Sequence, residues 1–215
     1  MVLLKAMLDV EGFILVGGAS SRMGSDKAQL MFGTQTGVQR IAAELTGLTN
    51  RVRVVGSRGK PEDCGFENVP DVLEHWGALG GIHSALAACQ TTWAFVIACD
   101  LPLVTSELLS RMWQLNNDKL DAIVPIQPDG RPQPLCAVYR REVNSDEAAR
   151  LIATGEHAPR GLLAQVRTRW VEPQELADLP GAEYFFLNVN TPTDYELAKQ
   201  ILERRISGRA QNRSL

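Results

Sequence analysis

The chain of 215 residues lacks several features that define large protein classes. No stretch approaches the ~20 apolar residues of a membrane-spanning helix, and Lys5, Asp9 and Glu11 interrupt the apolar N-terminus before it reaches signal-peptide length. Basic residues are not in excess, since 22 Lys and Arg stand against 25 Asp and Glu, for a net charge of −3. We therefore expect neither a general nucleic-acid binder nor a membrane partner.

Cysteine is also scarce and widely spaced. The four cysteines, Cys64, Cys89, Cys99 and Cys136, form no CxxC pair and no dense framework, so neither a zinc site nor a disulfide scaffold is indicated. Reduced thiols in a cytoplasmic protein are the expectation. The four tryptophans are expected in the core or an interface rather than as stacking platforms.

What the chain does contain is an alternation of apolar strands and amphipathic helices, with 45% apolar residues and 22% charged residues. Strands are predicted over residues 13–16, 51–55, 93–99, 122–126, 135–139, 169–171 and 184–187. Helices are predicted over residues 38–48, 82–89, 105–115, 145–153, 160–166 and 192–206. This order predicts an α/β fold, a three-layer α/β/α Rossmann-like domain whose mainly parallel sheet has helices on both faces. We expect residues 1–206 to form one domain and residues 207–215 to form a flexible tail.

The stretch of residues 12–27, GFILVGGASSRMGSDK, indicates a phosphate-binding loop. A buried strand runs into Gly17 and Gly18, whose backbone can approach a phosphate chain, and Arg22 and Lys27 supply positive charge. A Walker A motif is absent because Ala28 follows Lys27 where Ser or Thr is required, and no GxGxxG pattern occurs. The alternative on this stretch alone is a glycine-rich surface turn.

A carboxylate follows the apolar strand at residues 93–99. Asp100 is expected at the carboxyl end of that strand, over the same crevice as the glycine loop. It could cap the next helix, but an anion facing a phosphate loop favours an intervening divalent cation, and Mg²⁺ suits one carboxylate plus phosphate oxygens. Asn188 and Asn190 could contact nucleotide or metal-bound water, or be ordinary residues before a helix that Thr191 and Asp194 cap.

Five motifs occur together in this order: LVGGASSRMGSDK at residues 15–27, Pro70-Asp71, GALGGI at residues 77–82, CDLP at residues 99–102 and NVNTPTD at residues 188–194. In combination they resemble the MobA-like nucleotidyltransferase family, and within it most closely the molybdenum cofactor guanylyltransferases. The resemblance extends from about residue 12 to residue 200. Its members join the phosphate of molybdopterin, usually carrying molybdenum, to GMP from GTP and release pyrophosphate.

The resemblance also implies roles for individual residues. The binding site of the guanine nucleotide would be lined by Leu15, Val16, Gly17 and Gly18. Lys27 would hold the phosphates of the nucleotide, Asp71 would contact its nucleoside and Asp100 would bind Mg²⁺. Asn188 and Asn190 would face the cofactor-side substrate. Lys27, Arg22 and Asp100 are the expected catalytic residues. Two departures from the family pattern are Val16, where Ala is usual, and the stretch of residues 158–161.

Several alternatives remain open at this stage. Within the same class, the chain could be a cytidylyltransferase of the molybdenum cofactor or could act on another small phosphate, although the Gly17-Gly18 pair favours guanine by resemblance. A non-catalytic adaptor that binds nucleotide and cofactor would keep the glycine loop without needing Asp100. A dinucleotide-dependent oxidoreductase is the weakest alternative. The expected partners are GTP and molybdopterin, with molybdoenzymes or their chaperones as receivers of the product.

Overall fold

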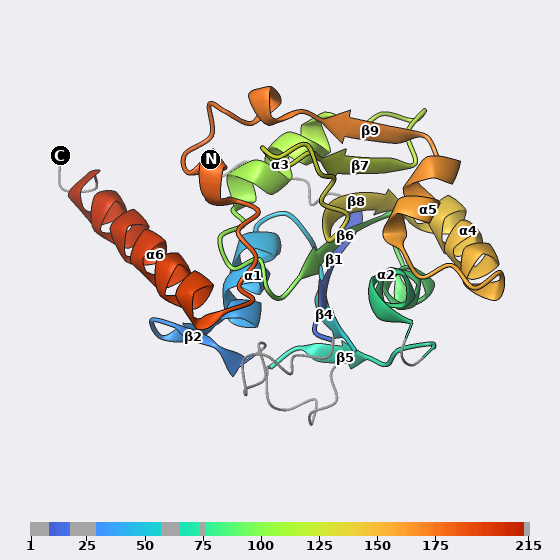
Figure 1. The fold of residues 1–215 in the computed structure, drawn as a ribbon, viewed down its shortest axis with the longest axis horizontal. Helices are drawn as coiled ribbons and strands as arrows, with labels where there is room; N and C mark the ends of the chain where they lie inside the picture. The colour runs from blue at the N-terminus through green and yellow to red at the C-terminus, as the bar shows by residue number, and fades with distance from the viewer. Residues whose placement is uncertain (1–8, 18–28, 57–64, 74–75, 213–215) are drawn as a thin grey trace, which may run out of the picture.

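The computed structural model of the chain describes residues 9–17, 29–56, 65–73 and 76–212. Its centre is a seven-stranded sheet in the order β5-β4-β1-β6-β8-β7-β9 (Figure 1). The strands are β1 (Val10–Leu15), β4 (Val52–Val55), β5 (Glu67–Val69), β6 (Trp93–Ala98), β7 (Ala122–Pro125), β8 (Cys136–Arg140) and β9 (Thr168–Val171). Only β8 runs against its neighbours, β6 and β7, so the prediction of a mainly parallel α/β sheet is confirmed.

The burial of the two central strands, β1 and β6, explains why the sequence predicts them clearly. Every residue of β1 and β6 is buried, and the two strands pair in parallel with Ile14 opposite Ile97. A strand covered on both faces needs apolar side chains at successive positions rather than at alternate ones. The continuous apolar runs of these strands therefore reflect a layer of helices on each side.

Helices cover both faces of the sheet, as Figure 1 shows. On one face lie α1 (Gly37–Thr46) and α3 (Ser106–Gln114); on the other lie α2 (Gly77–Ala88), α4 (Arg141–Ala153) and α5 (Pro159–Gln165). Neighbouring residues of β1 divide between the two cores, because Ile14 packs with α1 and α3 whereas Phe13 packs with α2, α4 and α5. This division produces the three-layer architecture.

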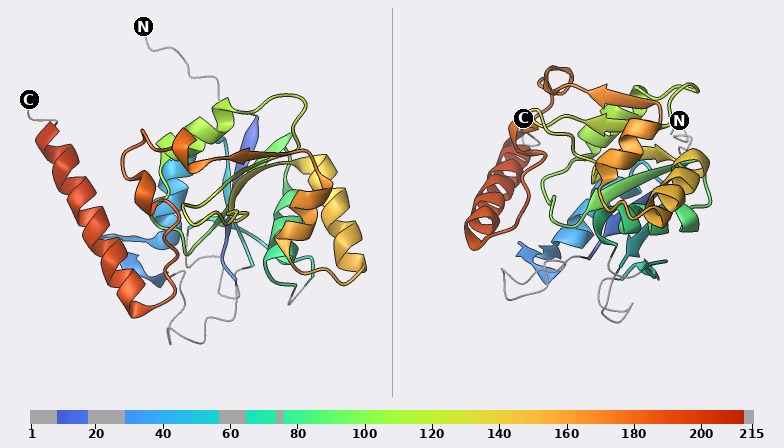
Figure 2. Two further views of the ribbon diagram at one scale, coloured as in Figure 1. Left: turned by 45° about the horizontal axis from the view of Figure 1, so that its top comes forward. Right: turned by 45° about the vertical axis from the view of Figure 1, so that its right-hand side comes forward.

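The C-terminal helix α6 (Pro192–Asn212) lies outside these layers, along the side of the molecule that carries α1 (Figure 2). It shares a third apolar cluster with Phe32 of the small hairpin β2 (Met31–Phe32) and β3 (Gln35–Thr36). Its start confirms the predicted capping box: the Asp194 N–H donates to Thr191 Oγ1 at 3.1 Å, and the Thr191 N–H donates to the Asp194 carboxylate at 2.8 Å. No helix of the described residues has the length and apolarity that crossing a membrane would require.

One predicted strand is wrong. Residues 184–187 form successive turns after the short 3₁₀ helix η4 (Ala182–Tyr184), where the Leu187 N–H donates to the Tyr184 carbonyl at 3.1 Å. Phe185 and Phe186 are both buried in the core beside α1 and α3. This apolar run therefore contributes buried side chains to the core from a segment of turns, and it does not form a strand.

Other element boundaries differ from the prediction. β5 was not predicted, because in its three residues only Val69 is buried. α6 extends to Asn212 rather than to residue 206, and so includes part of the segment expected as a tail. α2 starts at Gly77 rather than at residue 82, and the glycines of its first turns allow close packing: a Cβ on Gly81 would lie 3.1 Å from Leu15 Cδ1.

Candidate active site

The ends of four parallel strands place the residues of the candidate site at one edge of the sheet. At the carboxyl ends of β1, β4, β5 and β6 the chain reaches Gly17, Gly56, Asp71 and Asp100 in turn. Backbone hydrogen bonds hold the ends side by side: the Val16 N–H donates to the Val55 carbonyl at 2.8 Å, and the Cys99 N–H donates to the Leu15 carbonyl at 3.0 Å. Ligands of open parallel sheets bind at this edge.

Gly56 brings two of the candidate residues together. Its φ of +82° lies in the region that favours glycine, and a Cβ here would lie 3.1 Å from Asp71 Oδ2 and 3.2 Å from the Val16 carbonyl oxygen. The Asp71 carboxylate therefore lies against the turn that follows β4, next to the end of β1. The tight turn leaves no room for a side chain between them.

Leu15 and Val16 contribute little side chain to the edge. Each is only 8% exposed, Leu15 in the core with α2 and Val16 in the core with α1 and α3. The larger side chain of Val16, at the position where Ala is usual in the family pattern, is taken up by this core. The Leu15 carbonyl and the Val16 N–H are already hydrogen-bonded within the sheet, and the chain continues into the exposed Gly17.

Asp71 is exposed, and the segment that follows it is fixed by a buried hydroxyl of α2. The Val72 N–H donates to Ser84 Oγ at 2.9 Å, and Ser84 Oγ in turn donates to the Gly80 carbonyl at 2.8 Å. Ser84 is completely buried. It was not recognised in the sequence, because a serine inside a helix gives no signal of its distant partner.

Asp100 is half-buried at the end of β6, in contact with the segment that precedes α6. The Val189 N–H donates to the Asp100 carbonyl at 2.9 Å, so Asn188 and Asn190 flank a residue bonded directly to the Asp100 backbone. Asn188 is half-buried, whereas Asn190 is exposed and donates its backbone N–H to the Asp194 carboxylate at 3.1 Å. Sequence positions almost ninety residues apart thus meet at this edge.

Three of the predicted residues, Gly18, Arg22 and Lys27, lie outside the described residues. Their roles in binding phosphate stay predictions.

A cavity of about 620 Å³ opens beyond Asn188, on the side of Asp100 away from β1. Its walls come from the loop between β7 and β8, from the start of α5 and from Trp170 of β9. Two contacts support these walls. The buried Tyr139 hydroxyl donates to the Pro134 carbonyl at 2.8 Å, and His157 stacks on Trp76 with ring centroids 4.2 Å apart, which joins the start of α5 to the start of α2.

The cavity was not predicted, and of the residues that line it Asn188 had been proposed for the site whereas Gln133, Arg160 and Trp170 had not. Trp170 was expected in the core, and residues 158–161 matched the family pattern poorly. The available signal was the proline-rich loop of residues 127–134, which is too long for a tight hairpin turn. A turn alone, however, does not reveal that its neighbours in space are α5 and β9.

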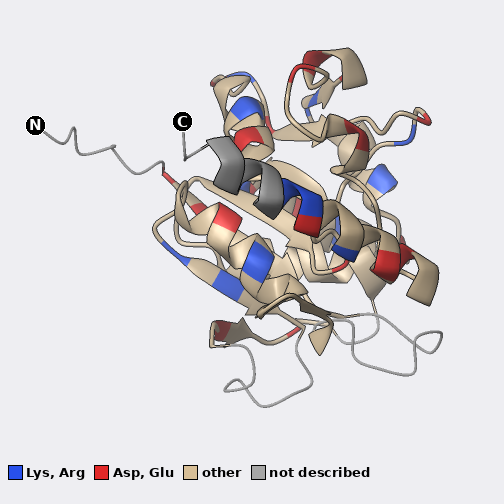
Figure 3. Cartoon of the chain, turned by 90° about the vertical axis from the view of Figure 1, so that its left-hand side faces the viewer, with Lys and Arg blue, Asp and Glu red and all other residues tan. Residues whose placement is uncertain are grey.

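No titratable nucleophile or metal cage stands out in the described part of the chain. Burial raises the pKa of the Cys136 thiol to about 12, so it stays protonated and unreactive, and burial lowers the pKa of His83. Among the described residues, no three or more His, Cys, Asp and Glu side chains gather in a way that would hold a metal ion. Figure 3 shows both basic and acidic residues along the described part of α6.

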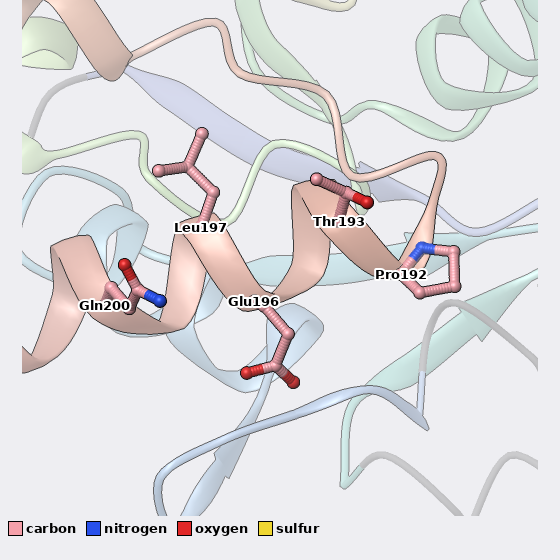
Figure 4. A pocket seen from close by; sticks show the side chains of 5 residues that line it. All are labelled: Pro192, Thr193, Glu196, Leu197 and Gln200. Atoms are coloured by element: carbon pink, nitrogen blue, oxygen red, sulfur yellow. The ribbon is translucent and has the colours of Figure 1, made fainter.

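A second, smaller hollow of about 420 Å³ lies on α6, lined by Pro192, Thr193, Glu196, Leu197 and Gln200 (Figure 4). All five side chains come from one helix, and none belongs to the predicted site. The hollow is therefore a feature of the helix surface and is separate from the strand ends.

Comparisons with known proteins point to one family. The family model described as the MobA-like NTP transferase domain matches residues 12–170. A probable molybdenum cofactor guanylyltransferase of Pelotomaculum thermopropionicum is 33% identical over 94% of this chain and 98% of its own length. A relative of the same description from Chloroflexus aggregans is 36% identical over 90% of this chain and 95% of its own.

Solved structures share the fold. The molybdopterin-guanine dinucleotide biosynthesis protein A of Archaeoglobus fulgidus superposes with a TM-score of 0.76 at 24% identity, covering 90% of this chain and 99% of that one. A 2-C-methyl-D-erythritol 4-phosphate cytidylyltransferase of Thermus thermophilus superposes with a TM-score of 0.65 at 18% identity, covering 90% and 98%. With the family model matching most of the sequence and both relatives matching nearly end to end, the chain belongs to the MobA-like nucleotidyltransferase family.

Proposed function

We propose that the chain is a Mg²⁺-dependent molybdenum cofactor guanylyltransferase, which transfers GMP from GTP to the phosphate of molybdopterin and releases pyrophosphate. The observation that carries the proposal is the nearly full-length similarity, at 33% and 36% identity, to two relatives described as probable enzymes of this activity. The meeting of Asp71, Asp100 and Asn188 at one sheet edge is consistent with it. The product would be the guanine dinucleotide form of the cofactor.

The reaction needs positioning and charge neutralisation more than a protein nucleophile. An oxygen of the molybdopterin phosphate forms a bond to the α-phosphorus of GTP, and the bond between the α-phosphorus and its bridging oxygen to the β-phosphate breaks. The attacking phosphate is already ionised, so no general base is required. Gly17 would offer its backbone to the phosphates, Arg22 and Lys27 would neutralise their charge, and Asp71 would contact the nucleoside.

The residues near Asp100 fit a Mg²⁺ ion that arrives with the nucleotide. Mg²⁺ commonly binds one or two carboxylates and takes its other ligands from phosphate oxygens and water. The single half-buried carboxylate of Asp100 meets that requirement, and no larger group of ligands is gathered among the described residues. When bound, the ion would supply charge stabilisation for the phosphates.

The proposal is tested by offering the purified protein molybdopterin and Mg²⁺ with either GTP or CTP and measuring pyrophosphate release. We expect release with GTP and molybdopterin together, and neither alone should suffice. A preference for CTP would contradict the guanylyl assignment in favour of a cytidylyltransferase. Binding of GTP and molybdopterin without any pyrophosphate release would instead favour an adaptor.

A further inference from the structure

We infer that Gln133 is a specificity residue for the acceptor: its carboxamide recognises the hydrogen-bonding edge of a flat heterocycle that occupies the cavity between the β7–β8 loop, α5 and Trp170. The inference rests on the proposed function, because it takes the cavity's occupant to be the acceptor substrate. The required ligand chemistry is an aromatic ring system with adjacent donor and acceptor atoms that also carries an anionic phosphate.

The first reason is the state of the Gln133 side chain. The residue is only 6% exposed and lines the cavity, yet its carboxamide makes no hydrogen bond to any part of the chain that the structure describes. The carboxamide atoms are not among the fully buried polar atoms that lack a partner, so they are accessible from the cavity. The cavity is where Gln133 can find that partner, and a carboxamide offers both donors and an acceptor to it.

The second reason is that Gln133 is held rigidly. Its N–H donates to the Pro125 carbonyl at 2.9 Å, and its carbonyl accepts from the Cys136 N–H at 3.2 Å. One residue further, the Pro134 carbonyl accepts the Tyr139 hydroxyl. Because its backbone is fixed, only the side-chain torsions of Gln133 remain to be ordered when a ligand binds.

The third reason is the chemistry of the opposite wall. Trp170 provides an aromatic surface against which a ring can pack, and Leu163 is a buried apolar neighbour. Arg160 is exposed at the start of α5 and forms none of the ion pairs among the described residues, so its charge is available to an anion. An apolar cavity with a few convergent polar groups is the usual form of a small-molecule site.

The fourth reason is the cavity's position. Asn188 lines it, and the next residue, Val189, is bonded to the Asp100 backbone. An acceptor whose ring lies beside Gln133 therefore extends its phosphate toward the strand end where the nucleotide is proposed to bind. The arrangement suits transfer between two substrates bound on either side of Asp100.

The test compares Gln133→Met, which keeps the side-chain volume and removes the hydrogen bonds, with the control Gln165→Met on the exposed end of α5. We expect Gln133→Met to raise the KM for molybdopterin about tenfold, as loss of one or two hydrogen bonds to a ligand does, and to leave the KM for GTP within about twofold. Gln133→Glu, which keeps the acceptor and loses the donors, should act in the same direction. The control should change neither KM.

A direct binding measurement separates this inference from the proposed function. Molybdopterin without GTP should quench the fluorescence of Trp170, and the quench should weaken in Gln133→Met and be lost in Trp170→Phe. If the wild-type protein shows this quench but transfers no GMP, the acceptor site stands and the proposed function fails. If the wild-type protein transfers GMP while Gln133→Met leaves both the quench and the molybdopterin KM unchanged, the assignment of Gln133 is overturned.

Discussion

The two edges of the central sheet carry opposite kinds of chemistry. At the carboxyl edge lie tight turns, exposed or half-buried carboxylates and an open cavity, among them Gly56, Asp71 and Asp100. At the amino edge two buried carboxylates are paired with arginines: Glu11 with the buried Arg53, and Asp121 with Arg167, whose side chain is 62% exposed. The polar groups of the carboxyl edge are accessible to ligands, whereas these charged groups of the amino edge are paired with one another within the protein.

The amino-edge pairs connect elements that are distant in the chain. Arg53 of β4 is bonded to Glu11 of β1 and donates to the Ala88 carbonyl at the end of α2 at 2.8 Å. Arg167 donates to both oxygens of Asp121 at 2.7 Å, where β7 and β9 begin. The difference predicts that substitutions at the amino edge change the folding stability and that substitutions at the carboxyl edge change substrate binding, each without the other.

The largest effect is expected at the carboxyl edge. Asp100→Ala should lower GMP transfer roughly 10³-fold, because it removes the carboxylate proposed to hold Mg²⁺ beside the phosphates. The melting temperature should stay close to that of the wild-type protein. Pyrophosphate release and a thermal scan measure both, and Asp146→Ala on the exposed face of α4 is the matched control. Full activity of Asp100→Ala would remove Asp100 from the catalytic site.

At the amino edge the largest expected effect concerns stability. Arg53→Met leaves Glu11 as a charge that is only 4% exposed, and should lower the free energy of unfolding by about 3–5 kcal/mol. The KM for GTP should not change at a temperature where the variant is folded. Urea unfolding checks the first point and kinetics the second.

A double variant provides the control for that pair. Glu11→Gln with Arg53→Met removes the stranded charge, so it should recover a large part of the lost stability. A loss no smaller than that of Arg53→Met alone would mean that packing of Arg53 over the Phe13 ring, 4.8 Å away, dominates over its charge.

The second amino-edge pair, Asp121 with Arg167, should make the free energy of unfolding depend on pH. The hydrogen bond from the Arg167 side chain holds the pKa of Asp121 below its ordinary value of 3.8. A lowered pKa in the folded state stabilises the protein above the ordinary pKa, and this contribution is lost as the pH falls through the folded-state value. Asp121→Asn should therefore cost about 1.5–3 kcal/mol at pH 7, with the difference from wild type shrinking below about pH 4.

Urea unfolding at pH 7 and at acid pH measures this difference. Asp178→Asn is the matched control, because Asp178 is also paired with an arginine, Arg111, but its side chain is 66% exposed. Surface pairs contribute little, so this control should have a small effect at either pH. An equal effect of the two variants would contradict the importance of burial at Asp121.

The smallest expected effect returns to the carboxyl edge. Gly56→Ala forces a side chain into a conformation with φ of +82° and against Asp71, so it should cost about 1–2 kcal/mol of stability and raise the KM for GTP several-fold. Gly33→Ala is the control, since its φ is +68° but no atom lies within 4 Å of the added Cβ. It should lose similar stability with an unchanged KM. A KM change in both variants would show that general strain, and not the displacement of Asp71, is responsible.

The sequence predicted the parts of the site that depend on local patterns. The apolar runs of β1 and β6 and the carboxylate at Asp100 follow from residues adjacent in the chain, and the structure brings these strand ends to one edge. The capping box at Thr191 was equally local and is confirmed. Strand ends can be predicted because a parallel sheet always gathers them at one side.

Features that depend on distant contacts were not predictable. Residues 184–187 have the composition of a strand, but they form a turn from which Phe185 and Phe186 reach into the core. The edge of the sheet is formed by β9 instead. Gln133 looks like a loop residue until Trp170 and α5 fold against its loop. Ser84 likewise acquires its role only through Val72, and neither residue alone indicates the contact.

The position of the antiparallel strand β8 in the sheet has a consequence for folding during synthesis. Strand β6 is buried along its whole length, and its outer partner is residues 136–140, which leave the ribosome only after β7 has been synthesised. Until then β6 is an apolar strand with an unpaired edge, the kind of surface that recruits other chains. A nascent or truncated chain that ends before β8 should therefore need protection from aggregation, although the strands that deliver Asp71 and Asp100 are already complete.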